Sequence, residues 1–139
     1  MKNVLLVLAL AMSTGTFAQL EVEKKPETVT LYSNLAMTRL VEFKKDSTDS
    51  FYALYYKDAQ YQHITVIKYL SLDNIAEVEQ LLDLSDKVLE TKEGFNTSKY
   101  SLMKTIGKNV LVINQEDSSR FFLNAKVITK MRESLTVKQ

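Results

Sequence analysis

The chain of 139 residues contains no cysteine, one proline, three glycines and one histidine. Without cysteine it forms neither disulfides nor thiolate metal sites, so its stability must come from packing. A single histidine excludes metal sites built from two or three histidines and the H-E-x-x-H helix. The glycines Gly15, Gly94 and Gly107 are too scattered to form a phosphate-binding loop. We therefore expect no bound metal and no cofactor.

A large net charge of either sign is also missing, because 18 basic residues nearly balance 17 acidic ones and leave a formal net charge of +1. Loss of Lys2 with an N-terminal signal would leave 17 of each. Proteins that bind nucleic acids in general have a strong basic excess, so we expect no nucleic-acid partner. The chain also lacks a G-x-S-x-G motif and a nucleophilic cysteine, and we assign no catalytic residue. These gaps favour a protein that is not an enzyme.

Long hydrophobic runs are absent except at the N-terminus. Lys2 precedes an apolar run over residues 4–12, and Thr16-Phe17-Ala18 ends it with a small residue at the cleavage position. This pattern predicts a signal peptide of bacterial type, residues 1–18, cleaved after Ala18, and hence a secreted or periplasmic protein. An uncleaved anchor is the alternative. No later run approaches the ~20 apolar residues of a membrane span, so we expect no stable membrane insertion after cleavage.

Residues 19–27 are polar, contain the only proline and are predicted to be a mobile leader. Residues 28–139 have the length of one domain. The clearest element in that domain is a long amphipathic helix over residues 71–94. Its apolar residues recur every three or four positions and must be buried: Ile75, Val78, Leu81, Leu82, Val88 and Leu89. Ser71 or Asn74 is its expected N-cap, and Gly94 its expected C′ residue.

Alternating apolar and polar residues predict strands on both sides of this helix. Four strands precede it, at residues 28–33, 37–44, 51–56 and 62–70. Three follow it, at residues 98–106, 110–114 and 120–123, before a closing helix over residues 125–135. The strands at 51–56 and 62–70 are apolar on both faces, which predicts central positions in the sheet.

The predicted fold class is α+β, an antiparallel sheet with element order ββββα-βββα and both helices packed on one face. This order resembles that of the Whirly single-strand-binding fold, whose unit is four strands and a helix. The resemblance is one of architecture, and predicted export and zero net charge argue against a shared function. A pleckstrin-homology-like barrel with an inserted helix is the alternative fold.

Tyrosines concentrated between residues 51 and 70 provide the candidate binding surface. Aromatic rings with polar tips suit wet interfaces with a sugar or a peptide, although a buried strand also uses tyrosine for its core. The candidate residues are Tyr52, Tyr55, Tyr56, Tyr61, His63 and Tyr69. His63 near Asp58 could also act as an oriented base. The sheet edge at Thr28 could instead pair with a strand of a partner.

The charged residues are distributed unevenly. Acids dominate residues 73–93 and bases dominate the chain from Lys99 onward. Three hypotheses follow: an exported, non-enzymatic binding or accessory domain with a protein, peptide or glycan partner; a small cell-envelope enzyme or enzyme inhibitor; and a structural subunit that self-associates through oppositely charged faces.

Overall fold

The computed structural model describes residues 25–46 and 48–138. The predicted signal and residues 19–24 of the predicted leader lie outside this part. Strand β1 already begins at Glu27, the last residue assigned to the leader. The elements are β1 (Glu27–Ser33), β2 (Arg39–Lys44), β3 (Ser50–Lys57), β4 (Ile67–Leu72), α2 (Ile75–Thr91), β5 (Phe95–Asn96), β6 (Tyr100–Lys104), β7 (Asn109–Asn114), β8 (Arg120–Asn124) and α3 (Ala125–Lys138).

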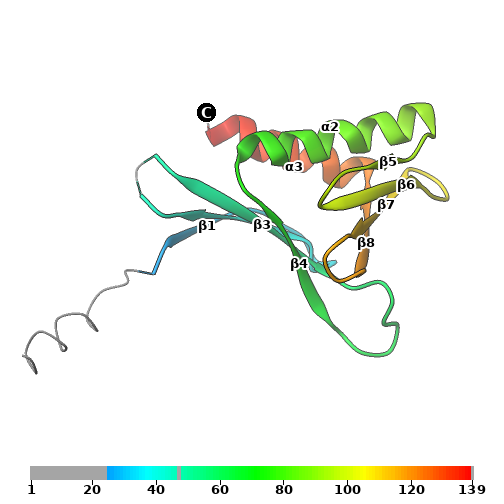
Figure 1. Ribbon diagram of the computed structural model, residues 1–139, viewed down its shortest axis with the longest axis horizontal. Coiled ribbons are helices and arrows are strands. Elements are labelled where there is room, and N and C mark those ends of the chain that lie inside the picture. Colours follow the sequence, from blue (N-terminus) through cyan, green and yellow to red (C-terminus); the bar gives the residue numbers. More distant parts are fainter. Residues whose placement is uncertain (1–24, 47, 139) are drawn as a thin grey trace, which may run out of the picture.

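The strands form two antiparallel four-stranded sheets, β1-β2-β3-β4 and β5-β6-β7-β8, each followed by one helix (Figure 1). The order ββββα-βββα is confirmed, with the two-residue strand β5 as an addition. There are two sheets rather than the single sheet expected, because strands pair only with their neighbours in sequence within each set of four, and α2 separates β4 from β5. Neither sheet closes on itself, so the pleckstrin-homology-like barrel is also wrong.

The long helix α2 begins directly after its N-cap residue, Asn74. The Asn74 side chain accepts a hydrogen bond from the Glu77 backbone N–H at 3.0 Å, and the Glu77 carboxylate accepts one from the Asp73 N–H at 2.7 Å. Of the two expected N-caps, Asn74 is therefore the one used. The C-terminus differs from expectation, because Lys92 takes the left-handed conformation (φ 62°) two residues before Gly94. A Cβ at Gly94 would lie 3.1 Å from the Leu102 carbonyl oxygen, so this glycine permits close approach to β6.

Both helices lie on the same side of the sheets and pack against each other (Figure 1). The centre of the predicted apolar stripe of α2, from Val78 to Val88, is buried, whereas Ile75 and Leu89 at its ends are partly buried. Helix α2 packs mainly on β6 and β7, and α3 contacts β1 as well as β8. Helix α2 therefore covers part of the second sheet, which follows it in the chain, and α3 covers part of the first sheet, which precedes it. Neither described helix has the length and apolar character needed to cross a membrane.

Three strands begin later than their sequence patterns predict, and one of them is β6, which starts at Tyr100 rather than residue 98. Strand β4 starts at Ile67 rather than residue 62, and residues 58–66 form a loop closed by the Asp58 N–H, which donates to the Val66 carbonyl at 2.8 Å. Strand β4 is an edge strand rather than a central one, whereas β3 is central as expected. Strand β2 starts at Arg39 rather than residue 37, because Met37 has a left-handed backbone (φ 64°) in the preceding turn.

Candidate binding surface

The six candidate residues separate into three environments. Tyr52 and Tyr56 are buried in the core, with 6% and 0% of their surface exposed. Tyr55 and Tyr69 lie on the face of the first sheet that points away from the helices, while Tyr61 and His63 lie in the loop between β3 and β4. The structure therefore brings Tyr55 and Tyr69 together and removes Tyr52 and Tyr56 from the surface.

Alternation along β3 explains the split, because successive side chains of a strand point to opposite faces. Tyr56 faces inward, where its ring stacks on Phe121 at 4.0 Å. Its hydroxyl lies 2.5 Å from the Ser119 hydroxyl and accepts a hydrogen bond from the Asn114 amide at 3.2 Å. Burial raises the pKa of the Tyr52 and Tyr56 hydroxyls. Tyr56 thus joins the first sheet to the second and is structural.

The outward side chains of β2, β3 and β4 form a row across the sheet at Arg39, Tyr55 and Tyr69. These residues are direct neighbours in the strand register. The Tyr55 and Tyr69 ring centroids are 5.8 Å apart, and the Arg39 guanidinium carbon lies 5.0 Å from the centre of the Tyr55 ring. Tyr69 has 56% of its surface exposed. The row therefore offers open aromatic surface beside a cation.

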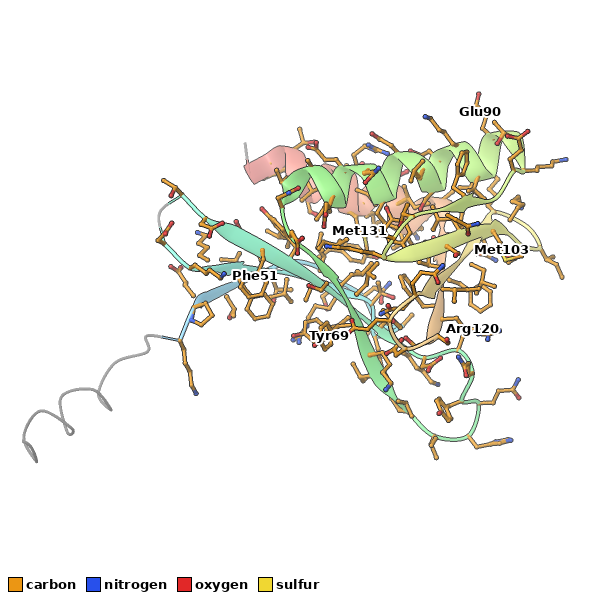
Figure 2. All side chains as sticks on the ribbon, viewed as in Figure 1. Phe51, Tyr69, Glu90, Met103, Arg120 and Met131 are labelled. Carbon is orange, nitrogen blue, oxygen red and sulfur yellow. The ribbon has the colours of Figure 1, made fainter. Side chains whose placement is uncertain are left out.

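A second row lies four residues further along β3, roughly 13 Å away. Here the Phe43 and Phe51 rings stack at 4.9 Å, and the Lys45 ammonium lies 5.6 Å from the centre of the Phe51 ring. Figure 2 shows Phe51 and Tyr69 on the side of the sheet away from the helices. We call the surface formed by Arg39, Phe43, Phe51, Tyr55 and Tyr69 the aromatic face.

The residues between the two rows of side chains are buried. Val41 and Ala53, which pair across β2 and β3, are only 5% exposed although they point away from the helices. The larger side chains on either side cover them, so the aromatic face has no deep pocket. Apart from Arg39, the charged strand position on this face is Lys57, which is also a cation. Sequence reasoning missed Arg39, Phe43 and Phe51, although the period-two spacing of Phe51 and Tyr55 could have placed those two on one face.

The proposed catalytic pair is not assembled. Asp58 is 2% exposed, and its carboxylate accepts backbone hydrogen bonds from Gln60 at 3.1 Å and Arg120 at 3.3 Å. His63 is exposed, and no hydrogen bond joins it to Asp58 in the described part of the chain. Asp58 therefore holds the loop to β8 and does not orient His63.

Acidic residues in turns also act on the backbone. The Asp46 carboxylate accepts hydrogen bonds from the Thr48 and Asp49 N–H groups, both at 2.8 Å, and these bonds lower its pKa. Asp117 likewise accepts from the Ser119 N–H at 2.9 Å. Within residues 25–46 and 48–138, no three histidine or acidic side chains gather in a way that could hold a metal ion.

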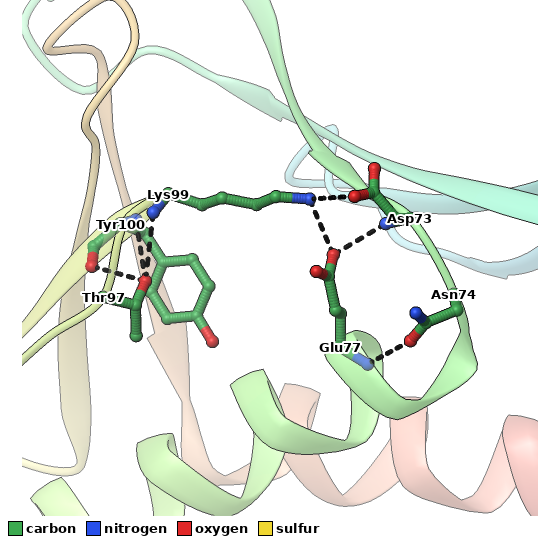
Figure 3. A network of polar contacts seen from close by, with 6 residues as sticks. All are labelled: Asp73, Asn74, Glu77, Thr97, Lys99 and Tyr100. Carbon is green, nitrogen blue, oxygen red and sulfur yellow. Dashed lines mark hydrogen bonds and ion pairs between the residues drawn. The ribbon is translucent and has the colours of Figure 1, made fainter.

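Part of the uneven charge is neutralised inside the molecule. The Lys99 ammonium lies 2.7 Å from the Glu77 carboxylate and 3.1 Å from that of Asp73, which ties the start of α2 to the second sheet (Figure 3). The Arg132 guanidinium of α3 bridges Asp83 at 2.8 Å and Asp86 at 2.6 Å on α2. The acidic helix and the basic C-terminal half therefore pair with each other.

Comparison with known proteins does not indicate a function for this chain. The chain matches none of the protein families, curated proteins and solved structures with which it was compared. Among the described residues, the aromatic face combines exposed rings with cations and has no opposing carboxylate. Such an arrangement can bind a ligand but carries no group placed for acid–base or nucleophilic chemistry.

Proposed function

We propose that this protein is an exported, non-enzymatic binding domain whose aromatic face holds an acidic glycan. The observation that carries the proposal is the pair of ring rows, each beside a cation, on a sheet face that no other described element covers and whose strand positions carry no acidic residue. Flat rings stack against the apolar faces of sugars. A guanidinium stacked on a ring keeps its in-plane N–H groups free to bind a carboxylate. Arg39 above Tyr55 has this arrangement.

The flatness of the surface favours a glycan over a protein partner. Protein interfaces concentrate their binding energy where an anchor side chain fills a desolvated pocket. The aromatic face has no such pocket, because Val41 and Ala53 are sealed beneath the surrounding rings. A chain of sugar rings needs only a flat platform, and its carboxylates would complement Arg39 and Lys57.

The proposal is tested by titrating the mature chain, beginning at Gln19, with a polyuronate and with neutral dextran in a calorimeter. We expect binding of the polyuronate only. Tyr69→Ala should lower the affinity about fivefold, because it removes one stacking ring. Arg39→Gln should lower it by a similar factor and reduce its dependence on salt.

Phe122→Ala is the matched control, because Phe122 is an exposed ring of the second sheet with 53% of its surface accessible. This variant should bind like the wild type. Equal binding of dextran, or an unchanged affinity after Tyr69→Ala, would contradict the proposal.

A further inference from the structure

The turn between β1 and β2 has an unusual composition. It contains Leu35, Ala36 and Met37, whereas tight turns are usually built from glycine, proline, asparagine, aspartate or serine. Leu35 is fully exposed and Met37 is about half exposed, at 49%. The turn therefore projects apolar side chains into solvent.

Hydrogen bonds hold this turn in one conformation. The Asn34 N–H donates to the Thr38 carbonyl at 3.1 Å, and the Asn34 side chain accepts from the Thr38 N–H at 3.0 Å. The Asn34 amide also donates to the Tyr32 hydroxyl at 3.2 Å. Met37 has φ 64°, a left-handed conformation that glycine or asparagine adopts more easily. The chain thus displays methionine where local preference opposes it, and such exceptions concentrate at functional sites.

Lysines flank the turn on both sides. A crevice of about 470 Å³ on one side is lined by Leu35, Lys126 and Lys130, among others. A crevice of about 400 Å³ on the other side is lined by Lys57 and by the aromatic residues Tyr61 and Phe122, among others. Both crevices meet at Ala36, and no carboxylate lines either of them. The apolar side chains at the tip of the turn are therefore flanked by the positive charges of Lys57, Lys126 and Lys130.

We propose that the 34–38 turn is a docking point for an anionic lipid surface. Leu35 and Met37 enter the headgroup region, Tyr61 and Phe122 lie at the interface, and the flanking lysines meet lipid phosphates. A protruding apolar tip suits a deformable membrane surface better than a protein partner, which would need a preformed pocket. This contact is peripheral and involves no membrane-spanning segment. It shares Lys57 with the proposed glycan site, uses none of the five residues that define the aromatic face, and does not depend on glycan binding.

The test is co-sedimentation of the mature chain, beginning at Gln19, with two kinds of vesicle. One contains phosphatidylglycerol in phosphatidylcholine, and the other phosphatidylcholine alone. Every buried core residue of the described structure lies between Leu40 and Leu135, so removal of residues 1–18 leaves the core intact. We expect binding to the anionic vesicles only, weakened by added salt.

The double variant Leu35→Ser, Met37→Asn should reduce this binding at least tenfold, because it removes both apolar side chains. Asparagine accepts the left-handed conformation, so the variant keeps the turn and the fold. Ile106→Ser is the control, because Ile106 is 93% exposed at the β6–β7 turn, and its binding should be unchanged.

Lys126→Gln and Lys130→Gln should each reduce binding about fivefold. The proposal is overturned if the wild type fails to sediment with anionic vesicles at low salt. It is also overturned if the turn double variant binds as well as the wild type, or if Ile106→Ser loses as much binding as the turn variant.

Discussion

At the scale of single residues, Tyr100 has opposing effects on stability: its ring stabilises the core, and its buried hydroxyl destabilises it. Its side chain is 2% exposed, and within the described part of the chain its hydroxyl has no hydrogen-bond partner. The side chain extends toward α2 (Figure 3). Burial, and to a lesser degree the charge of Glu77, raises the pKa of Tyr100 to about 12. The ring fills the core, while the hydroxyl costs free energy because it is desolvated without a bond.

The raised pKa of Tyr100 predicts that the protein loses stability in alkaline solution. The folded pKa lies above the unfolded value of 10, so the unfolded chain releases this proton first. The free energy of unfolding should therefore hold below pH 10 and fall by about 2 kcal/mol as pH rises toward 12. Tyr100→Phe should reduce that fall and leave stability at pH 7 equal or up to about 1 kcal/mol higher. Urea unfolding at pH 7 and pH 11 measures both effects, and about 1.4 kcal/mol of the fall should be present at pH 11.

Tyr61→Phe serves as the control, because Tyr61 is an exposed loop residue. It should unfold like the wild type at both pH values. A variant Tyr100→Phe with the same alkaline loss as the wild type would show that Tyr100 is not its source.

At the scale of elements, α2 is bound to its surroundings by ion pairs at its start and near its middle. Lys99 holds Glu77 and Asp73 at the first turn, and Arg132 holds Asp83 and Asp86 near the middle. Exposed ion pairs each contribute little, so the buried stripe supplies most of the stability of the helix. The N-cap is the local contact whose removal is easiest to measure.

Asn74→Ala should lower the free energy of unfolding by about 1 kcal/mol, because the Glu77 N–H loses its acceptor. Ser71→Ala is the matched control, since Ser71 was the other expected cap but lies exposed in β4. It should change stability by less than about 0.5 kcal/mol. Equal effects of the two substitutions in urea unfolding would argue against the observed helix start.

At the scale of the whole molecule, the two units of four strands and a helix are interlocked. Helix α2 follows the first sheet but packs mainly on β6 and β7 of the second. Helix α3 follows the second sheet but also contacts β1 of the first. The Tyr56–Phe121 stack joins the sheets directly. Because each unit packs its apolar surface against the other, we expect the chain to unfold as one cooperative domain.

We therefore expect fragments 19–94 and 95–139 to be unfolded when produced separately. The chain from Gln19 to Gln139 should unfold in one transition, with coincident curves from far-UV circular dichroism and tyrosine fluorescence. Mixing the two fragments should restore part of the helical signal, because each supplies the missing packing partner. A fragment that melts cooperatively by itself would contradict the interlocked arrangement.

The sequence alone was sufficient for features that depend on nearby residues. The apolar spacing around Val78 and Leu82 determined the buried stripe of α2, because helical periodicity places those side chains on one face. Alternation and turn residues determined the order of strands and helices. The choice between Ser71 and Asn74 remained open, since both have the side chain of an N-cap.

Only the tertiary structure decided features that depend on residues distant in the chain. Burial against the second sheet, where its ring stacks on Phe121, separated Tyr56 from Tyr55, although the two are adjacent in sequence. Pairing decided that β4 lies at an edge and that the strands form two sheets. The aromatic face arises from side chains on three strands, and its register is set by hydrogen bonds between those strands. The periodicity of one strand shows which of its own side chains share a face, but not which side chains of the neighbouring strand lie beside them.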